Sequence, residues 1–162
     1  MELYSKKDMN KILVIGAHSD DEALGCAGTI AKHVSQGDEV HFLFMTDGVG
    51  SRLIRANEAK ERLTTAQKAA DILGVKSFKN LNFPDNKMDS ISLLDVVKQI
   101  EIQIENIQPD VIYTHHIGDL NIDHQITYRA TMTACRPQPS FCVKEIYSFE
   151  VLSSTEWSLS SD

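Results

Sequence analysis

Two short stretches of the sequence combine histidine with aspartate, the side chains that supply nitrogen and oxygen ligands to divalent metal ions. The first is AHSDDE at residues 17–22, and the second is HHIGDLNIDH at residues 115–124. Each stretch follows a short run of β-branched and other apolar residues, which is typical of a buried strand. If the fold brings the two stretches together, they can bind one metal ion between them.

The spacing of these residues predicts a catalytic rather than a structural metal site. His18 and Asp21 are separated by a strand-to-helix turn, so both side chains can point to the same side. His124, early in a predicted helix, can complete a three-ligand set, which leaves a fourth position for water. Asp20 can accept a proton from that water and return it to a leaving amine. Asp123 can orient a histidine through a hydrogen bond.

Less specific roles also suit several of these residues. Asp20 and Asp21 stand where helix N-caps and first-turn acids are common, and taken alone this pattern is more typical of capping than of catalysis. Capping does not account for His18 or for the second cluster. His115 is either an ordinary loop histidine or a residue that supports the site. Structural roles are expected for His33, His41, Cys26 and Cys135.

The elements that must position these clusters alternate along the chain. Short apolar runs predict five buried strands, at residues 11–15, 39–45, 77–81, 110–114 and 144–149. Helical spacing predicts four helices between them, at residues 22–35, 57–73, 92–107 and 122–135. Gly37 and Gly74 follow two of these helices and Pro109 follows a third, as residues that end helices do.

This alternation predicts one α/β domain over residues 1–162, with a Rossmann-like, doubly wound and mostly parallel sheet covered by helices on both faces. In the strand order 3-2-1-4-5, strands 1 and 4 are neighbours, and the chain leaves them in opposite directions. A crevice therefore opens at their carboxyl ends. Because the two clusters follow these two strands, we expect them to meet in that crevice.

Composition narrows the classes of function. The net charge is -7 and no Lys/Arg cluster exceeds a pair, which argues against a nucleic-acid partner. No signal peptide or membrane span is visible, and the three cysteines lack CxxC spacing, so a reducing, cytoplasmic location is expected. Residues 14–17 imitate the start of a dinucleotide-binding motif, but no GxGxxG follows, and the acids at residues 20–22 would repel a pyrophosphate.

The two clusters also resemble a known family. AHSDDE at residues 17–22 resembles the AHPDDE signature of the LmbE-like, or PIG-L, zinc-dependent N-deacetylases, and residues 114–115 with 119–124 resemble that family's second signature. Weaker similarity runs through residues 46–48, 61–62, 69–75 and 83–85, so that the likeness covers roughly residues 10–150.

This resemblance implies Zn²⁺, or another divalent ion, bound by His18, Asp21 and His124, with Asp20 as the general base. The implied substrate is a small molecule that carries an N-acetylated amino sugar, often N-acetylglucosamine linked to a second group. The implied fold is the Rossmann-like sheet already expected from the alternation of elements. A homo-oligomer is left open.

The sequence departs from the family pattern at four places. Ser19 replaces the usual proline. Asn121 stands where several members have a histidine that helps to stabilise the oxyanion, and an amide can donate a hydrogen bond there without carrying a charge. Arg62 lacks the acidic residue that usually follows it. The chain stops at Asp162, so we expect a domain without the usual C-terminal extension.

Three further residues are candidates for contact with the substrate. Asp47, at the end of the second predicted strand, either contacts a substrate hydroxyl or caps the turn. Arg52, with Arg55 close by, either binds a phosphate or carboxylate of the substrate or is a solvated loop charge. Arg62 is a candidate through the family resemblance alone.

Three functions are therefore compared. The favoured one is a zinc-dependent hydrolase that removes an N-acetyl group from an amino sugar or glycoconjugate. The second is a metal-binding domain of the same fold that is catalytically inactive or regulatory. The third is a nucleotide-binding oxidoreductase, which predicts cofactor binding without a metal.

Overall fold

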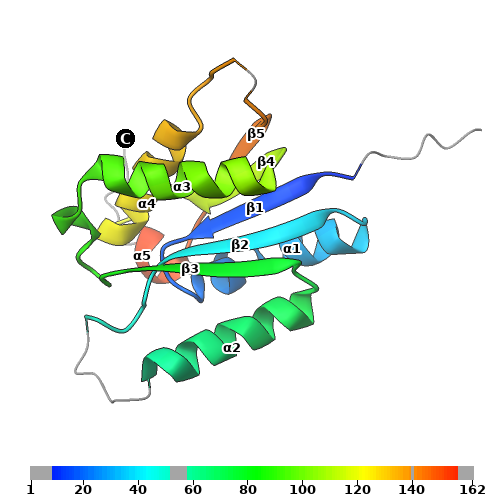
Figure 1. The fold of residues 1–162 in the computed structure, drawn as a ribbon. Helices are drawn as coiled ribbons and strands as arrows, with labels where there is room; N and C mark the ends of the chain where they lie inside the picture. Colours follow the sequence, from blue (N-terminus) through cyan, green and yellow to red (C-terminus); the bar gives the residue numbers. More distant parts are fainter. Residues whose placement is uncertain (1–8, 52–57, 140, 157–162) are drawn as a thin grey trace, which may run out of the picture.

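The computed structural model describes residues 9–51, 58–139 and 141–156. Within them, one sheet has five strands, all parallel, in the order β3-β2-β1-β4-β5 (Figure 1). The strands are β1 (Lys11–Gly16), β2 (Glu39–Thr46), β3 (Ser77–Phe83), β4 (Val111–His115) and β5 (Glu145–Phe149). The predicted fold class and strand order are confirmed, and β3 extends beyond its expected end at residue 81.

Two helices cover each face of the sheet. Helices α1 (Asp21–Ser35) and α2 (Glu58–Leu73) lie on one face, and α3 (Leu93–Ile107) and α4 (Ile122–Ala134) lie on the other (Figure 1). Their bounds agree closely with the predicted ranges, although residue 57, the expected start of α2, lies outside the described residues. The one-turn helix η1 (Met88–Ser90) and the short helix α5 (Leu152–Thr155) were not expected.

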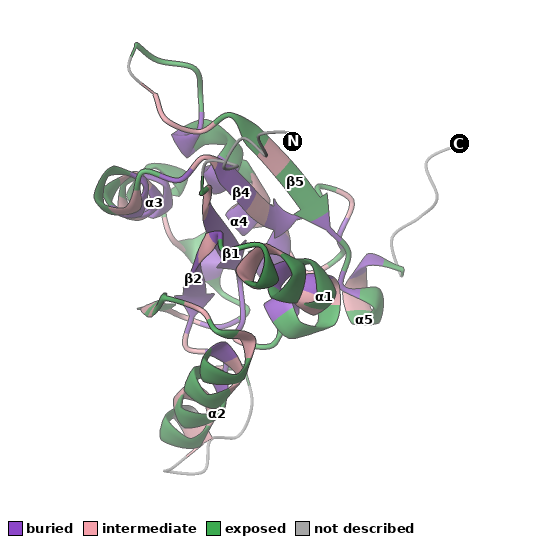
Figure 2. Cartoon of the chain, turned by 90° about the vertical axis from the view of Figure 1, so that its right-hand side faces the viewer, coloured by how far each residue is buried: buried purple, intermediate pink, exposed green. Residues whose placement is uncertain are grey.

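The core explains why the strands are continuous apolar runs. Alternate residues of a strand face opposite sides, and both sides of this sheet are covered by helices. Ile12 and Val14 of β1 pack toward α1 and α2, whereas Leu13 and Ile15 pack toward α3 and α4. All four are 0% exposed. Figure 2 shows this buried layer at the centre of the sheet.

Local signals set the ends of the helices. Gly37 and Gly74 adopt φ values of +85° and +74°, the left-handed conformation that glycine tolerates best. Ser92 caps α3 by accepting the N–H of Asp95, and Asn121 caps α4. Helix α3 ends before Pro109, which cannot continue it.

The topology creates one crevice. β1 pairs with β2 on one side and β4 on the other, and the chain leaves β1 toward α1 on one face and β4 toward α4 on the opposite face. The loops after β1 and β4 therefore lie at the same edge of the sheet. Among the described helices, none is long and apolar enough to cross a membrane.

Candidate metal centre

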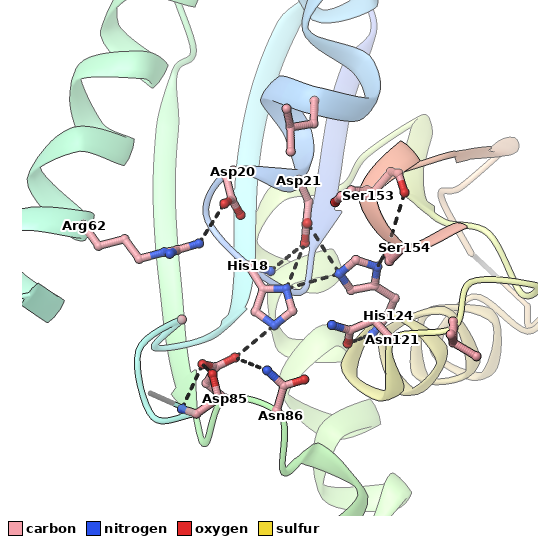
Figure 3. A pocket seen from close by; sticks show the side chains of 15 residues that line it. His18, Asp20, Asp21, Arg62, Asp85, Asn86, Asn121, His124, Ser153 and Ser154 are labelled. Carbon is pink, nitrogen blue, oxygen red and sulfur yellow. Dashed lines mark hydrogen bonds and ion pairs between the residues drawn. The ribbon is translucent and has the colours of Figure 1, made fainter. Parts of the chain in front are cut away.

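A cavity of about 340 Å³ opens at the carboxyl ends of β1 and β4. Its walls come from the loop after β1, the loop that precedes α4, the start of the loop after β2, the β3–η1 loop, and helices α1, α2, α4 and α5. Figure 3 shows the side chains that line it. Both His/Asp clusters contribute to these walls, as the topology requires.

Three of the predicted residues converge at the base of this cavity. His18 Nδ1 lies 3.2 Å from His124 Nε2 and 3.4 Å from Asp21 Oδ2, and His124 Nε2 lies 3.4 Å from Asp21 Oδ1 (Figure 3). The three residues are 8%, 3% and 3% exposed for His18, Asp21 and His124. Their ligand atoms all lie within 4.8 Å of one another, so a single ion can contact all three.

The second nitrogen of each histidine contacts a carboxylate. His18 Nε2 lies 3.2 Å from Asp85 Oδ1 and 3.2 Å from Asp123 Oδ2. His124 Nδ1 lies 2.9 Å from Asp119 Oδ2. Histidines that bind metals usually donate their other ring N–H to a carboxylate in this way, which fixes the ring and its tautomer. Two nitrogens and one carboxylate, oriented like this, fit a divalent metal ion.

The carboxylates also shift the pKa values of the histidines. Burial lowers the pKa of His18, but hydrogen bonds to Asp123, Asp21 and Asp85 outweigh it and raise the pKa to about 11. Burial likewise lowers the pKa of His124, and the hydrogen bonds to its carboxylate partners raise it to about 9. These side chains alone thus favour positive charge between the carboxylates, and a metal cation would compete with the protons for that place.

Asp21 responds in the opposite sense. Burial would raise its pKa, but the charge and hydrogen bonds of the surrounding histidines hold the pKa well below its usual range. Asp21 is therefore a carboxylate at neutral pH, which is the form that binds a metal. Its Oδ2 also accepts the backbone N–H of His18 at 2.7 Å, which fixes the carboxylate in place.

Asp20 stands at the N-cap position of α1, yet its side chain makes no capping hydrogen bond. Its Oδ2 instead lies 2.9 Å from Arg62 Nη2, and 53% of the side chain is exposed toward the cavity (Figure 3). Capping, the more common role for this sequence pattern, is therefore wrong for Asp20. This carboxylate lines the same cavity as the three converging ligand atoms, and one of its oxygens pairs with a guanidinium.

The three residues expected to support the ligands lie around them. Asp123 contacts His18 rather than its neighbour His124. Asn121 Oδ1 caps α4 by accepting the N–H groups of Asp123 and His124, so its NH₂ group is the part that can act as a donor toward the cavity. His115 is fully buried, accepts the Ala17 N–H at 2.9 Å and stacks on His124 at 3.9 Å. His115 is thus the last residue of β4, in contact with a candidate ligand, and not a loop histidine.

The candidate substrate contacts have different positions. Asp47 Oδ1 accepts the N–H groups of Val49 and Gly50 at 3.1 Å each, so it caps its turn. Arg62 reaches over the cavity wall from α2, where its Nε donates to Ser19 Oγ at 3.3 Å. The serine that replaces the family's proline thus supplies a partner for Arg62. Arg52 lies outside the described residues, as does Arg55.

Residues that the sequence did not single out complete the surroundings of the ligands. Asp85 lies in the turn after β3 and contacts His18. The Pro-Asp-Asn sequence of this turn follows a strand that ends at the same edge of the sheet, and this signal could have indicated Asp85. Asp119 lay within the second cluster without a predicted role. Ser154 and Thr155 of α5 contact Asp119, and no sequence pattern points to them.

The residues that were expected to be structural lie away from the cavity. His33 forms hydrogen bonds with Asp38 and Tyr113, and His41 forms them with Ser77 and Glu39. Cys26 and Cys135 are buried in the two cores.

The fold and the site together define a Rossmann-like α/β protein with a candidate metal centre at its switch point. The family model described as GlcNAc-PI de-N-acetylase (PIG-L) matches residues 13–135. The chain therefore belongs to the PIG-L family of deacetylases, as the resemblance of its two signatures predicted.

Three similar proteins show the range of this likeness. The uncharacterized deacetylase YaiS of Escherichia coli (strain K12) is 34% identical over 142 residues, which cover 85% of this chain and 74% of that protein. The structure of N,N'-diacetylchitobiose deacetylase from Pyrococcus horikoshii has a TM-score of 0.71 at 27% identity and covers 84% of this chain. 4-Oxalmesaconate hydratase of Pseudomonas putida is 30% identical over 148 residues, 80% of this chain. The chain spans only 54% and 55% of the last two proteins.

Proposed function

We propose that this chain is a metal-dependent N-deacetylase that hydrolyses the acetamide of an N-acetylated amino sugar or glycoconjugate. One observation carries the proposal: His18, Asp21 and His124 offer three converging ligand atoms at the base of a cavity, with the Asp20 carboxylate at its wall. Membership of the PIG-L family and the likeness to diacetylchitobiose deacetylase support the choice of substrate.

The metal is proposed to be Zn²⁺, since two imidazoles and one carboxylate suit zinc, although such sites also accept other divalent ions. His18 would bind through Nδ1 and His124 through Nε2, because their other nitrogens face carboxylates. A divalent ion held there would supply Lewis acidity, which lowers the pKa of water and polarises an acyl oxygen.

Asp20 is proposed to move the proton. As water attacks the acetamide carbon, Asp20 accepts its proton, and the protonated Asp20 then donates to the nitrogen of the leaving amine. The ion pair with Arg62 orients the carboxylate for this role, and its exposure to the cavity gives the substrate access. Asn121 is proposed to donate from its NH₂ group to the oxyanion, since capping fixes the orientation of this amide.

Apart from the proposed ion, the described part of the cavity wall offers an anionic substrate no free guanidinium. Among the described lining residues, Asp20, Asp21 and Asp85 are acidic, whereas Arg62 is the one guanidinium and is already paired with Asp20. The hydratase relative is named for 4-oxalmesaconate, an anion with several carboxylates. Such an anion would find the described guanidinium already paired with Asp20, whereas the hydroxyls of an N-acetylated sugar can donate hydrogen bonds to the carboxylates of the wall.

The test combines metal analysis with an assay of amine release. The purified protein, its chelated form and the Asp20→Asn variant would be assayed on N,N'-diacetylchitobiose and other N-acetylglucosamine derivatives. We expect one divalent ion per chain, activity that is lost with chelation, and a fall of about 10²–10⁴-fold in kcat for Asp20→Asn with the ion retained. Asp89→Asn, an exposed aspartate on η1, is the matched control.

Each other outcome has a distinct meaning. Near wild-type activity in Asp20→Asn would contradict the assignment of the base. A bound ion without turnover on any acetamide would favour the alternative of a non-catalytic, metal-binding domain. Binding of a nucleotide cofactor in a protein without metal would contradict the whole proposal.

A further inference from the structure

Helix α5 follows β5 and lies against the loop that carries the second His/Asp cluster. Two hydroxyl side chains of this helix contact the buried carboxylate of Asp119, which is 1% exposed. Figure 3 shows Ser154 above the ring of His124. The helix is thus joined to the candidate metal centre by polar contacts, at a place where the family signatures contain no residue.

The contacts are short and converge on one oxygen. Thr155 Oγ1 donates to Asp119 Oδ2 at 2.6 Å, and Ser154 Oγ donates to the same oxygen at 2.9 Å. Thr155 Oγ1 also accepts the backbone N–H of Val151 at 2.9 Å, so its own proton is directed toward Asp119. The other oxygen of Asp119 accepts the backbone N–H of Asn121 at 2.8 Å. Four donors, with His124 as the fourth, therefore fix the Asp119 carboxylate in one orientation.

This orientation decides which nitrogen of His124 faces the other ligands. Asp119 Oδ2 lies 2.9 Å from His124 Nδ1, so in the neutral imidazole, the form that binds a metal, the carboxylate accepts the Nδ1 proton and the lone pair is on Nε2. Nε2 is the atom that faces His18 and Asp21. A carboxylate that rotated would release the imidazole from this tautomer and ring position, and the ligand atom would no longer be held ready.

We propose that Thr155 and Ser154 are positioning residues for the metal ligand His124 and act through Asp119. The inference rests on the proposed function insofar as it requires a divalent ion at this site. It adds that the segment after β5, which lies outside both sequence signatures, sets the metal affinity. A purely structural role is the competing explanation, since Thr155 also closes the turn of α5 by accepting the Val151 N–H.

The test measures metal affinity and fold separately. Chelated protein would be titrated with Co²⁺ against a competing chelator, and the ligand-field absorption of bound Co²⁺ would report its geometry. Thr155→Val keeps the shape but removes the hydroxyl, and we expect about tenfold weaker Co²⁺ binding with an altered spectrum. Asp119→Asn should weaken binding by about 10–100-fold. The melting temperature of each chelated variant reports the fold.

Two further variants serve as controls. Thr155→Ser keeps the hydroxyl and should bind Co²⁺ as the wild type does. Ser153→Ala removes an exposed hydroxyl on the same helix that lies outside the Asp119 contacts, and it should leave the affinity unchanged. Ser154→Ala combined with Thr155→Val should weaken binding more than either change alone.

The outcomes separate this inference from the proposed function. If Thr155→Val lowers the melting temperature of the chelated protein but leaves Co²⁺ affinity and spectrum unchanged, the role is structural and the inference is wrong. If the wild type binds no divalent ion, both the proposed function and this inference are wrong. A wild type that binds Co²⁺ and deacetylates nothing would contradict the catalytic proposal while leaving the positioning role measurable and intact.

Discussion

Replacing Asp123 with asparagine should both destabilise the protein and weaken its metal binding. Asp123 is fully buried, and its Oδ2 accepts the N–H of Asn86 at 2.7 Å and contacts His18 Nε2 at 3.2 Å. Its Oδ1 accepts the N–H of Met88 at 3.1 Å. One carboxylate thus joins helix α4 to the β3–η1 loop and to a candidate ligand. Asparagine has a single carbonyl oxygen to replace both carboxylate oxygens.

The size of the effect follows from these contacts. In either orientation of the asparagine amide, its NH₂ group faces the backbone N–H of Asn86 or of Met88. Both groups are donors, so this N–H loses its hydrogen bond. A buried donor without a partner costs about 1–3 kcal/mol, and a hydrogen bond to a charged group contributes about 1.5–3 kcal/mol. We expect a loss of about 2–4 kcal/mol in the free energy of unfolding, and metal binding that is about 10–100-fold weaker because His18 loses an orienting partner.

Urea unfolding of the chelated proteins measures the first effect, and chelator competition with Zn²⁺ measures the second. The matched control is Asp89→Asn, the same chemical change at an exposed aspartate next to Met88, which should stay within about 0.5 kcal/mol of the wild type. If Asp123→Asn proved as stable as this control, the buried Met88 side chain, not the carboxylate, would hold the loop. Unchanged Zn²⁺ affinity would show that Asp85 alone orients His18.

Four other predictions concern stability, metal binding and pH. Gly25→Ala should lower the free energy of unfolding by about 1–3 kcal/mol, because a Cβ there would lie 2.4 Å from Phe149 Cδ2. Gly28→Ala, where a Cβ would meet nothing within 4 Å, should raise it by up to about 1 kcal/mol. The urea midpoints of the two variants measure this difference. A hydrogen bond from the backbone N–H of Lys11 lowers the pKa of Asp110, so Asp110→Asn should reduce stability at pH 7, and this difference should shrink below pH 3.8 as pH falls through the lowered pKa. The raised pKa values of His18, about 11, and His124, about 9, stabilise the chelated protein fully below pH 6.5, and in thermal melts this contribution should be lost as pH rises through about 9 for His124 and about 11 for His18. The same protons must leave when the metal binds, so Zn²⁺ affinity should fall as pH falls, with proton release detectable by calorimetry in different buffers.

The sequence by itself determined the fold and the place of the site. Apolar runs and helical spacing are local signals, and Gly37, Gly74 and Pro109 mark helix ends by their own backbone chemistry. Once the order of strands and helices is known, the handedness of parallel crossovers leaves few topologies. The carboxyl ends of β1 and β4 must then meet, and this brought the two His/Asp clusters together as expected.

The hydrogen-bond partners were decided only by the tertiary structure. Asp123 contacts His18, 105 residues away in the chain, although His124 is its neighbour in sequence. Asp20 pairs with Arg62 of α2 instead of capping its own helix. These hydrogen-bond and ion-pair partners depend on side-chain rotamers and on which distant segments pack against the site. The periodicity of the local sequence contains neither kind of information.

Helix α5 illustrates the same limit most clearly. Thr155 bonds to Asp119 across 36 residues of chain, and a serine-threonine pair after a strand has no distinctive pattern. A sequence can specify which residue types are present and which sheet edge they reach, because these follow from local propensity and topology. The distances between their polar atoms follow from the packing of the whole domain, and only the folded structure contains them.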